Sequence, residues 1–217
     1  KIYFSPTGGT KKVADIISEG IENIFMDIDM IKKPKKLSQI NFMADDLCIF
    51  AVPSYGGRIP AVTVEIFRNL KGNGAKAVLT AVFGNRAIDD TLIELQDILE
   101  KDGFVISAGI EAVSQHSLMP AFGKGRPDEK DKKDLIDFGR KIKEKAEKGI
   151  INNVVLPGNH NYRTYNGVPF KPKANGKCNK CGICTNECPA NAISKENPKI
   201  TDNDKCISCM HCVFVCP

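Results

Sequence analysis

The chain has 217 residues, of which 42% are hydrophobic and 26% are charged, and its formal net charge is +5. This length allows one large domain, or a medium domain joined to a small one. No signal peptide or apolar span is visible, so membrane insertion is not expected. Because 8 of the 9 cysteines lie after position 177, the arrangement with two domains is favoured.

Residues 1–149 alternate short β-rich runs with amphipathic segments. This alternation is typical of a parallel sheet with helices on both faces. The sequence therefore predicts a doubly wound α/β domain with a five-stranded parallel sheet. The expected strands are Ile2–Phe4, Phe25–Met30, Leu47–Val52, Ala75–Phe83 and Phe104–Ala112.

Apolar residues recur at helical spacing between these strands. Three helices are predicted from Val13, Ile16, Ile17, Ile21 and Ile24, from Val62, Ile66, Phe67 and Leu70, and from Leu92, Leu95, Ile98 and Leu99. A fourth helix is expected to begin at the cap Asp128 and to cover the sheet with Leu135, Ile136, Phe138 and Ile142. The lysine run around Pro34 is expected to be a solvated loop.

A loop rich in hydroxyl groups follows the first predicted strand and directly precedes a helix. It reads Ser5-Pro6-Thr7-Gly8-Gly9-Thr10. Hydroxyls and free backbone N–H groups at a helix N-terminus bind a phosphate dianion without a lysine. A dinucleotide-binding fold would show Gly-x-Gly-x-x-Gly here, and that pattern is absent. The loop therefore favours a terminal phosphate monoester such as that of flavin mononucleotide (FMN).

Two further loops follow the third and fourth predicted strands. They read Pro53-Ser54-Tyr55-Gly56-Gly57-Arg58 and Gly84-Asn85-Arg86. In open α/β sheets, ligands bind beyond the carboxyl ends of the strands, where the strand order reverses, and loops at these positions flank that crevice. Tyr55 is expected to stack on a flat ring, while the glycines let backbone amides approach the ring edge. The alternative for Tyr55 is a partly exposed loop aromatic.

Two copies of one cysteine motif end the chain: Cys178-x-x-Cys181-x-x-Cys184-x-x-x-Cys188-Pro189 and Cys206-x-x-Cys209-x-x-Cys212-x-x-x-Cys216-Pro217. The motif resembles that of bacterial-type ferredoxins, which hold two [4Fe-4S] clusters. In this resemblance, the first three thiolates of each copy bind one cluster and the fourth binds the other. The expected ligand sets are Cys178, Cys181, Cys184 and Cys216 for one cluster, and Cys206, Cys209, Cys212 and Cys188 for its partner.

A disulfide framework and a zinc site are the alternatives for these cysteines. Disulfides suit a short secreted chain, whereas here the cysteines are confined to one end. Zinc usually takes two Cys-x-x-Cys pairs set well apart, not three evenly spaced cysteines and a fourth followed by proline. The sequence favours clusters because the motif occurs twice.

Residues 177–217 are expected to form a small C-terminal α+β two-cluster ferredoxin domain. This segment has too few large apolar side chains to fold without its metal. Six of them are expected to form a jacket around the clusters: Ile183, Ile193, Ile200, Ile207, Val213 and Phe214. Residues 150–176 contain no acidic residue and are expected to be an irregular connector that lies against one or both domains.

Together these loops and motifs resemble a family that fuses a flavodoxin-like domain to a two-cluster ferredoxin. In this resemblance, Ser5, Thr7 and Thr10 occupy the hydroxyl positions of a flavodoxin phosphate loop, and Gly8 and Gly9 close its turn. Val52–Arg58 and Val82–Arg86 look like isoalloxazine loops. Gly9 departs from many flavodoxins, which have another residue there. Lys32–Asn41 offers no acidic aromatic loop, so the resemblance is to short-chain flavodoxins.

A few other side chains are candidates for chemistry. His116 follows the fifth predicted strand and is a candidate proton or hydrogen-bond donor near the flavin, the alternative being an ordinary loop histidine. Arg58 and Arg86 are candidates to stabilise an anionic reduced ring, or else are solvated cations. Cys48 is expected to be a small buried hydrophobe, and His211 is expected to be exposed between two cluster ligands.

The leading functional hypothesis is a soluble electron-transfer protein that relays single electrons between the two clusters and FMN, with a redox protein as donor or acceptor. One alternative is an FMN-dependent reductase acting on a small-molecule acceptor over the flavin, and another is an iron–sulfur redox sensor. A substrate pocket over the ring favours the reductase, and a bare flavin edge favours the carrier. Clusters far from the ring favour the sensor.

The basic net charge does not indicate nucleic-acid binding. Two oxidised clusters with eight thiolates carry about −2 each, and a flavin phosphate adds about −2, so the loaded protein is near neutral. A reducing cytoplasm is expected, in an anaerobic cell, because oxygen destroys exposed clusters. The chain starts inside a predicted strand and stops one residue after a cluster ligand, so native residues are expected beyond both ends.

Overall fold

A computed structural model describes residues 1–149 and 154–217 of the chain. Its five strands form one parallel sheet in the order β2-β1-β3-β4-β5. They are β1 (Ile2–Tyr3), β2 (Ile28–Asp29), β3 (Leu47–Pro53), β4 (Lys76–Phe83) and β5 (Val105–Val113). This order is that of flavodoxin-like doubly wound folds, and it reverses between β1 and β3. The predicted five-stranded parallel sheet is therefore confirmed.

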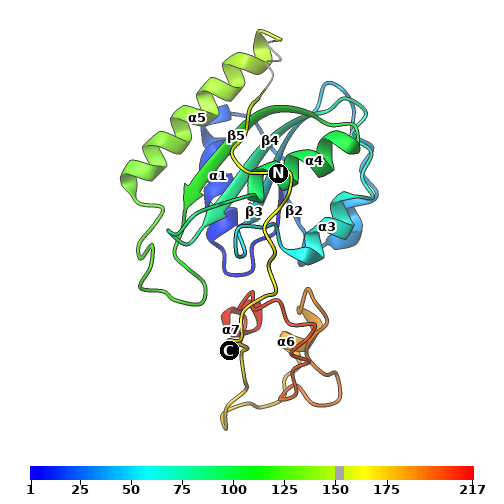
Figure 1. Cartoon of the computed structure of the whole chain (residues 1–217), viewed down its shortest axis with the longest axis vertical. Helices are drawn as coiled ribbons and strands as arrows, with labels where there is room; N and C mark the ends of the chain where they lie inside the picture. The colour runs from blue at the N-terminus through cyan, green and yellow to red at the C-terminus, as the bar shows by residue number, and fades with distance from the viewer. Residues whose placement is uncertain (150–153) are drawn as a thin grey trace.

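Helices cover both faces of this sheet (Figure 1). Helices α1 (Gly9–Ile21) and α5 (Glu129–Glu147) pack on one face, and α3 (Ala61–Phe67) and α4 (Thr91–Lys101) pack on the other. Strand β3 shows how the two faces are built: Ile49 and Ala51 join the first core, while Phe50 and Val52 join the second. Both sets are fully buried, as expected for a parallel strand between two helical layers.

Phe50 lies at the centre of the core under α3 and α4. Its ring meets Phe67 edge-on at 5.7 Å and Phe104 at 5.1 Å between centroids. On the other face, Gly20 of α1 and Gly139 of α5 allow the two helices to touch. A Cβ at Gly139 would lie 2.3 Å from the Ile17 carbonyl oxygen, so no larger residue fits without moving the helices apart.

The start of α5 follows the prediction, since Asp128 is its cap. Asp131 N donates to Asp128 Oδ1 at 3.0 Å, and Asp128 N donates to Asp131 Oδ2 at 2.9 Å. This reciprocal pair is a capping box, which satisfies two N–H groups that the helix itself cannot.

Three expectations about the helices are wrong. Ile24 is 98% exposed, because α1 ends at Ile21 and Glu22 takes a left-handed conformation that stops the helix. Phe138 is 40% exposed, because it lies beside rather than on the buried stripe of α5. The lysine run is not simply a loop, since Pro34–Leu37 form the short helix α2, whose Leu37 is fully buried.

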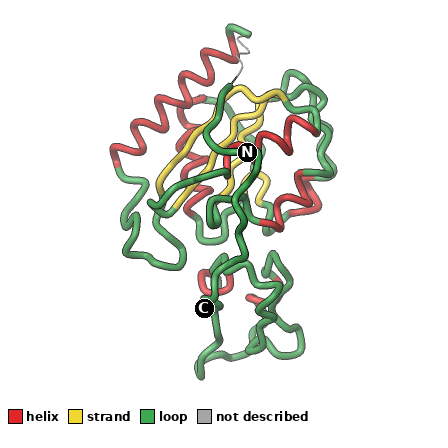
Figure 2. The backbone as a smooth tube through the Cα atoms, viewed as in Figure 1, coloured by secondary structure: helices red, strands yellow, loops and turns green. Residues whose placement is uncertain are grey.

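After α5, residues 154–168 run along the α/β domain, as expected for the connector, and residues 177–217 form a separate small body (Figures 1 and 2). Residues 154–176 contain no helix or strand. Residues 177–217 contain the one-turn helices α6 (Ile183–Asn186) and α7 (His211–Phe214), and one antiparallel bridge joins Ile193 to Thr201. Residues 150–153 of the expected connector lie outside the described residues.

The expected apolar jacket around the clusters is confirmed for four of its six residues. Ile183, Ile193, Ile207 and Val213 line the cavities between the cysteines. Ile200 and Phe214 line neither cavity and are exposed, so the expectation is wrong for these two. Within residues 1–149 and 154–217, no helix has both the length and the apolar character that a membrane span requires.

Candidate functional site

A cavity of about 130 Å³ opens at the carboxyl ends of β1, β3, β4 and β5. This is the edge of the sheet at which its strand order reverses, the position expected for a ligand in an open α/β sheet. Predicted residues on all three loops line the cavity: Thr7, Gly9, Thr10, Pro53, Ser54, Tyr55, Gly56 and Gly84. The other predicted flavin-binding residues, Ser5, Gly8, Gly57, Asn85 and Arg86, do not line it.

The first loop brings the N-terminus of α1 to the cavity. Ser5 Oγ accepts a hydrogen bond from Lys11 N at 2.9 Å, and Gly8 has a φ of 84° that lets the chain turn into the helix. Gly9 is packed tightly, since a Cβ there would lie 2.4 Å from Ser114 Oγ. The helix N-terminus carries partial positive charge and free N–H groups, so Gly9, Thr10 and Thr7 fit a phosphate.

The second loop holds Tyr55 in a tight turn. Tyr55 N donates to Arg58 O at 2.8 Å, and Arg58 N donates to Tyr55 O at 3.2 Å. The turn needs positive φ at both intervening residues, 60° at Gly56 and 84° at Gly57, which glycine adopts without strain. Burial raises the pKa of the Tyr55 hydroxyl, so the side chain is neutral and its ring can form an apolar wall.

His116 also lines the cavity. Its Nδ1 accepts hydrogen bonds from Leu118 N at 3.1 Å and from Met119 N at 3.2 Å. Burial lowers the pKa of His116, so the ring is neutral at pH 7 and carries its proton on Nε2. Its ring packs over Gly84, where a Cβ would lie 2.4 Å from the imidazole. The glycine after β4 is thus required by the histidine after β5.

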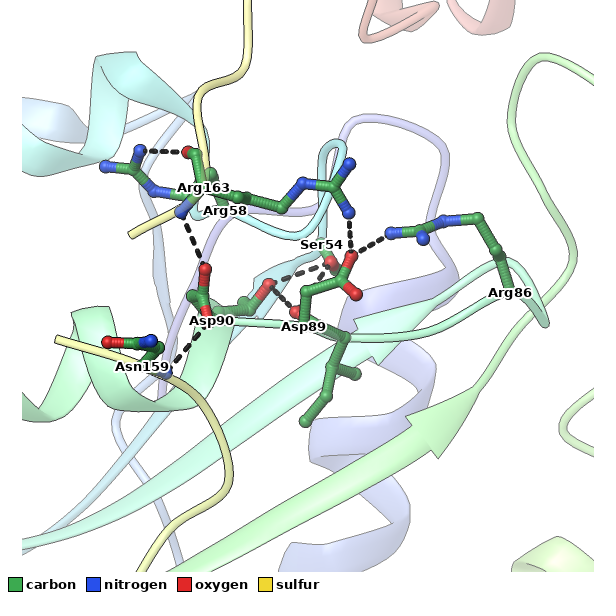
Figure 3. Close-up of polar contacts among 9 residues, drawn as sticks. Ser54, Arg58, Arg86, Asp89, Asp90, Asn159 and Arg163 are labelled. Carbon is green, nitrogen blue, oxygen red and sulfur yellow. Dashed lines mark hydrogen bonds and ion pairs between the residues drawn. The ribbon is translucent and has the colours of Figure 1, made fainter. Parts of the chain in front are cut away.

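Neither Arg58 nor Arg86 lines this cavity. Arg58 forms a two-pronged ion pair with Glu94, with Nη2 to Oε1 at 2.6 Å and Nε to Oε2 at 2.8 Å. That carboxylate raises the pKa of Arg58 further above its ordinary value. Arg86 is paired with Asp89 in the loop before α4 (Figure 3). Both guanidinium groups fix loops, and the cavity wall is built from other residues.

Several lining residues were not predicted from the sequence. Ser114, Gln115, Ser117 and Leu118 follow β5, and the rule that ligands lie beyond strand ends was sufficient to include them. Tyr165 and Val168 come from the connector, and Ile207 and Ser208 come from the C-terminal segment. No local pattern marks these four, because they reach the cavity only through the placement of two distant segments.

The eight clustered cysteines surround two further cavities. One, of about 320 Å³, is lined by Cys178, Cys181, Cys184, Cys212 and Cys216, and the other by Cys188, Cys206, Cys209 and Cys212. Apart from Cys212, which borders both, this division is that of the two expected ligand sets. Burial raises the pKa of Cys209 to about 12, and the other cysteines of its set contribute.

The arrangement fits a pair of cubane clusters. In the described residues, no three His, Cys, Asp or Glu side chains converge on one ion position. A cubane does not need such a group, because each thiolate binds a different iron at a different corner. When bound, each cluster supplies one-electron redox chemistry, and the eight cysteines of the two motifs are the residues that would hold them.

His211 is buried, with 4% of its surface exposed, and the expectation that it is exposed is wrong. Its Nδ1 lies 2.7 Å from the Pro6 carbonyl oxygen, to which it donates, and its Nε2 lies 3.0 Å from Glu187 Oε2. Pro6 belongs to the first loop of the α/β domain, so His211 ties the C-terminal segment to that loop. Cys48 is buried, as predicted.

Residues 177–217 match the family model described as a 4Fe-4S dicluster domain. No curated protein sequence matches the chain. A flavodoxin of Streptococcus pneumonia TIGR4 is 18% identical over 66% of this chain and 96% of that chain, with a TM-score of 0.46. The flavodiiron core from Synechocystis sp. PCC6803 is 17% identical over 69% of this chain and 36% of that chain, with a TM-score of 0.45.

The flavodoxin of Megasphaera elsdenii is 19% identical over 64% of this chain and 96% of that chain, with a TM-score of 0.41. The strand order of the chain itself, rather than these likenesses, carries the assignment of the fold. Residues 177–217 form a 4Fe-4S dicluster domain, an electron-transfer module, joined to an α/β domain with the flavodoxin strand order.

Proposed function

We propose that this protein relays single electrons between two [4Fe-4S] clusters and an FMN bound at the carboxyl edge of the sheet. One observation carries the proposal. Cys206 and Cys209 are ligands of one expected cluster, and the two residues between them, Ile207 and Ser208, line the cavity of the α/β domain. The same four-residue loop therefore serves the cluster and the flavin site, which brings the two redox groups close together.

The residues around the cavity fit FMN. The N-terminus of α1, with Thr7 and Thr10, is placed to hold the phosphate, and Tyr55 forms an apolar wall beyond it. Gly56 and Gly84 also line the cavity, where the rings of Tyr165 and His116 lie against them. FMN, when bound, supplies redox chemistry in one- or two-electron steps. The chain binds and orients it, and no side chain is required as a nucleophile.

The two cluster sites occupy different positions in the proposed relay. Cys209 is buried and directly follows Ser208, which lines the flavin cavity, so its site is the inner one. Cys181 and Cys216 of the other site are exposed. We therefore place the docking surface of a redox protein partner beside the outer site. A reducing cytoplasm suits a cluster at such an exposed position.

Two double variants test the order of the relay. After anaerobic loading with FMN, iron and sulfide, the protein is titrated with electrons and then re-oxidised, while flavin and cluster absorbance are followed together. In the wild type, we expect the fractions of reduced flavin and of reduced clusters at a given number of added electrons to be the same during reduction and during re-oxidation. We expect Cys178→Ala/Cys181→Ala, which lacks the outer cluster, to keep this exchange.

The matched variant Cys206→Ala/Cys209→Ala lacks the inner cluster and is expected to slow exchange with the flavin at least tenfold. Iron content shows that each variant has lost only one cluster. Equal exchange rates in the two variants would contradict the order. A wild-type protein whose clusters are fully reduced and re-oxidised without any exchange with FMN would overturn the relay itself.

A reductase is the second candidate, and His116 is the observation that favours it. The neutral ring lines the cavity and carries a proton on Nε2, which suits hydrogen bonding to an acceptor over the flavin. If the protein is a reductase, His116→Gln lowers turnover of a small acceptor at least tenfold while FMN affinity is kept. An unchanged turnover rate in His116→Gln would contradict the reductase and favour the electron carrier. The sensor is disfavoured because the inner cysteines lie beside the cavity rather than far from it.

A further inference from the structure

The connector supplies part of the wall of the proposed flavin cavity. Tyr165 and Val168 line it together with the loops of the sheet. The Tyr165 ring lies directly on the backbone of the second loop, since a Cβ added to Gly56 would lie 2.1 Å from Tyr165 Cδ2. Gly56 therefore has two roles: it turns the chain after Tyr55, and it leaves room for a second aromatic ring.

A buried carboxylate holds the connector in this position (Figure 3). Asp90 precedes α4 and is 8% exposed. Its Oδ1 accepts a hydrogen bond from Asn159 N at 2.8 Å, and its Oδ2 accepts one from Arg163 N at 2.7 Å. Both oxygens of the Asp90 side chain thus accept from backbone N–H groups of the connector, and the second donor, Arg163, lies two residues before Tyr165.

Arg58 and Asp89 add a second attachment. Arg58 Nη1 donates to the Arg163 carbonyl oxygen at 2.9 Å, and Arg163 Nη1 donates to Asp89 Oδ2 at 2.6 Å. Figure 3 shows these groups converging on the connector from the loops after β3 and β4. Those are the two loops predicted to bind the isoalloxazine ring. The connector is fixed to the loops that the flavin would touch.

Beyond Tyr165, the connector reaches the inner cluster loop. Ser208 Oγ donates to the Phe170 carbonyl oxygen at 2.9 Å, and Lys171 Nζ donates to the Cys206 carbonyl oxygen at 2.5 Å. One short segment therefore runs from the flavin loops to the loop that carries Cys206 and Cys209. Any displacement of Tyr165 also displaces the chain that positions this cluster loop.

We propose that the connector is a third loop of the isoalloxazine site, beside the loops after β3 and β4, in which Tyr165 forms one wall and Asp90 and Arg58 clamp the segment in place. The inference rests on the proposed FMN site. It assigns the connector a direct contact with the flavin ring, beyond its role as a link between domains. It also makes flavin binding and the position of the inner cluster loop depend on the same segment.

Flavin titration of the full chain loaded with iron and sulfide tests the contact, with flavin fluorescence as the signal. We expect Tyr165→Ala to weaken FMN binding about tenfold, in line with the effect of removing one aromatic stacking partner from a flat ring. Tyr165→Phe keeps the aromatic ring, and its FMN affinity should stay within about twofold of that of the wild type. Phe170→Ala is the matched control, since Phe170 is an exposed aromatic of the same connector that lines no described cavity near the flavin site.

Riboflavin, which lacks the phosphate, separates a ring contact from a general loosening of the site. If Tyr165 touches the isoalloxazine ring, Tyr165→Ala weakens the binding of riboflavin and the binding of FMN by the same factor. A loss confined to FMN would mean that the phosphate loop was disturbed, and it would overturn the inference. Equal FMN affinity in Tyr165→Ala and the wild type would overturn it as well.

The clamp is tested separately by Asp90→Asn, a change of nearly equal shape. One oxygen becomes an NH₂ group facing a backbone N–H, so the clamp loses an acceptor. We expect FMN affinity to fall at least threefold, with faster proteolytic cleavage within residues 159–171. The control Asp45→Asn alters an exposed carboxylate and should change neither. Wild-type cleavage and affinity in Asp90→Asn would contradict the clamp, whereas a wild-type protein that fails to bind FMN would refute the proposed function instead.

Discussion

In residues 1–149, the sheet and its helices bury many large side chains completely, among them Phe4, Phe50, Phe67, Leu79 and Leu95. In residues 177–217, all of which the structure describes, the buried apolar residues are Ala192, Ile193 and Cys209. The two parts have a similar need to offset chain entropy, which is about 1–2 kcal/mol per ordered backbone residue. They meet this need by different means.

The α/β domain relies on apolar burial, which contributes about 25 cal/mol per Å² removed from water. The dicluster domain has no comparable core, and its eight cysteines take that place. Metal ligation that occurs only in the folded chain contributes its binding free energy directly to folding. The chain therefore combines an α/β domain that is stable through its own packing with a dicluster domain whose fold depends on its cofactors.

Removal of iron is expected to have the largest effect. In a chain stripped of iron and sulfide, residues 177–217 should lose their fixed structure, while the sheet keeps its thermal unfolding transition. Limited proteolysis and circular dichroism measure the two outcomes on the same sample. The matched control is the same protein after anaerobic reconstitution, which should regain protection of the C-terminal segment.

A dicluster domain that stays protected without metal would contradict this comparison. So would a sheet that unfolds when the iron is removed. In the first case, packing between side chains, and not the metal, would have to stabilise residues 177–217. In the second case the contacts of His211 and Ser208 would be essential to the sheet rather than additions to it.

Phe50→Ala tests the other side of the comparison. The Phe50 ring is fully buried and packs edge-on against Phe67 and Phe104, so its removal leaves a cavity. We expect the free energy of unfolding of the α/β domain to fall by about 3–5 kcal/mol, as measured by denaturant titration. Iron content per folded molecule should not change.

Phe138→Ala is the control for this substitution, because Phe138 is an aromatic residue of α5 that remains 40% exposed. Its cost should be about 1–2 kcal/mol, since the ring is already partly in water and its removal leaves no enclosed cavity. Equal costs for the two variants would show that the centre of the sheet is not where the stability of the domain lies.

Local patterns predicted the parts of the molecule that depend on neighbours in sequence. The five strands, the helix cap at Asp128 and the two cysteine motifs all follow from spacing within short windows. The loops at the cavity were predicted as well, because strand ends in a parallel sheet meet at one edge. The individual roles of their residues toward FMN stay predictions.

Features that depend on the docking of distant segments could not be predicted. His211 was expected to be exposed because it stands between two cluster ligands, but its burial depends on Pro6, which lies 205 residues earlier. The connector was expected to lie against a domain, but no local pattern placed Tyr165 at the cavity, because its position depends on the contacts of the connector with Asp90 and Arg58. Ile24 failed for a local reason instead: it fitted the helical spacing, but the left-handed Glu22 ends the helix before it.

The smallest predicted effect concerns the capping box of α5 and its dependence on pH. The hydrogen-bonded Arg126 guanidinium lowers the pKa of Asp131 below its ordinary value of 3.8. A carboxylate with a lowered pKa in the folded state adds stability above the unfolded value and loses it as the pH falls through the folded value. Asp131→Asn should therefore cost about 1 kcal/mol at neutral pH.

This cost should shrink as the pH falls from 3.8 through the lower pKa of folded Asp131, where the wild-type carboxylate becomes neutral as well. Thermal unfolding of the α/β domain, followed by circular dichroism between neutral and acid pH, measures it. Asp134→Asn is the control on the same helix, since Asp134 is 53% exposed and its ion pair with Lys130 is worth less than about 0.5 kcal/mol. The contrary result is a cost for Asp131→Asn that is the same at neutral and at acid pH. The cap would then be stabilised by the geometry of its hydrogen bonds and not by the charge of Asp131, and the α/β domain would not depend on charge even at this helix end.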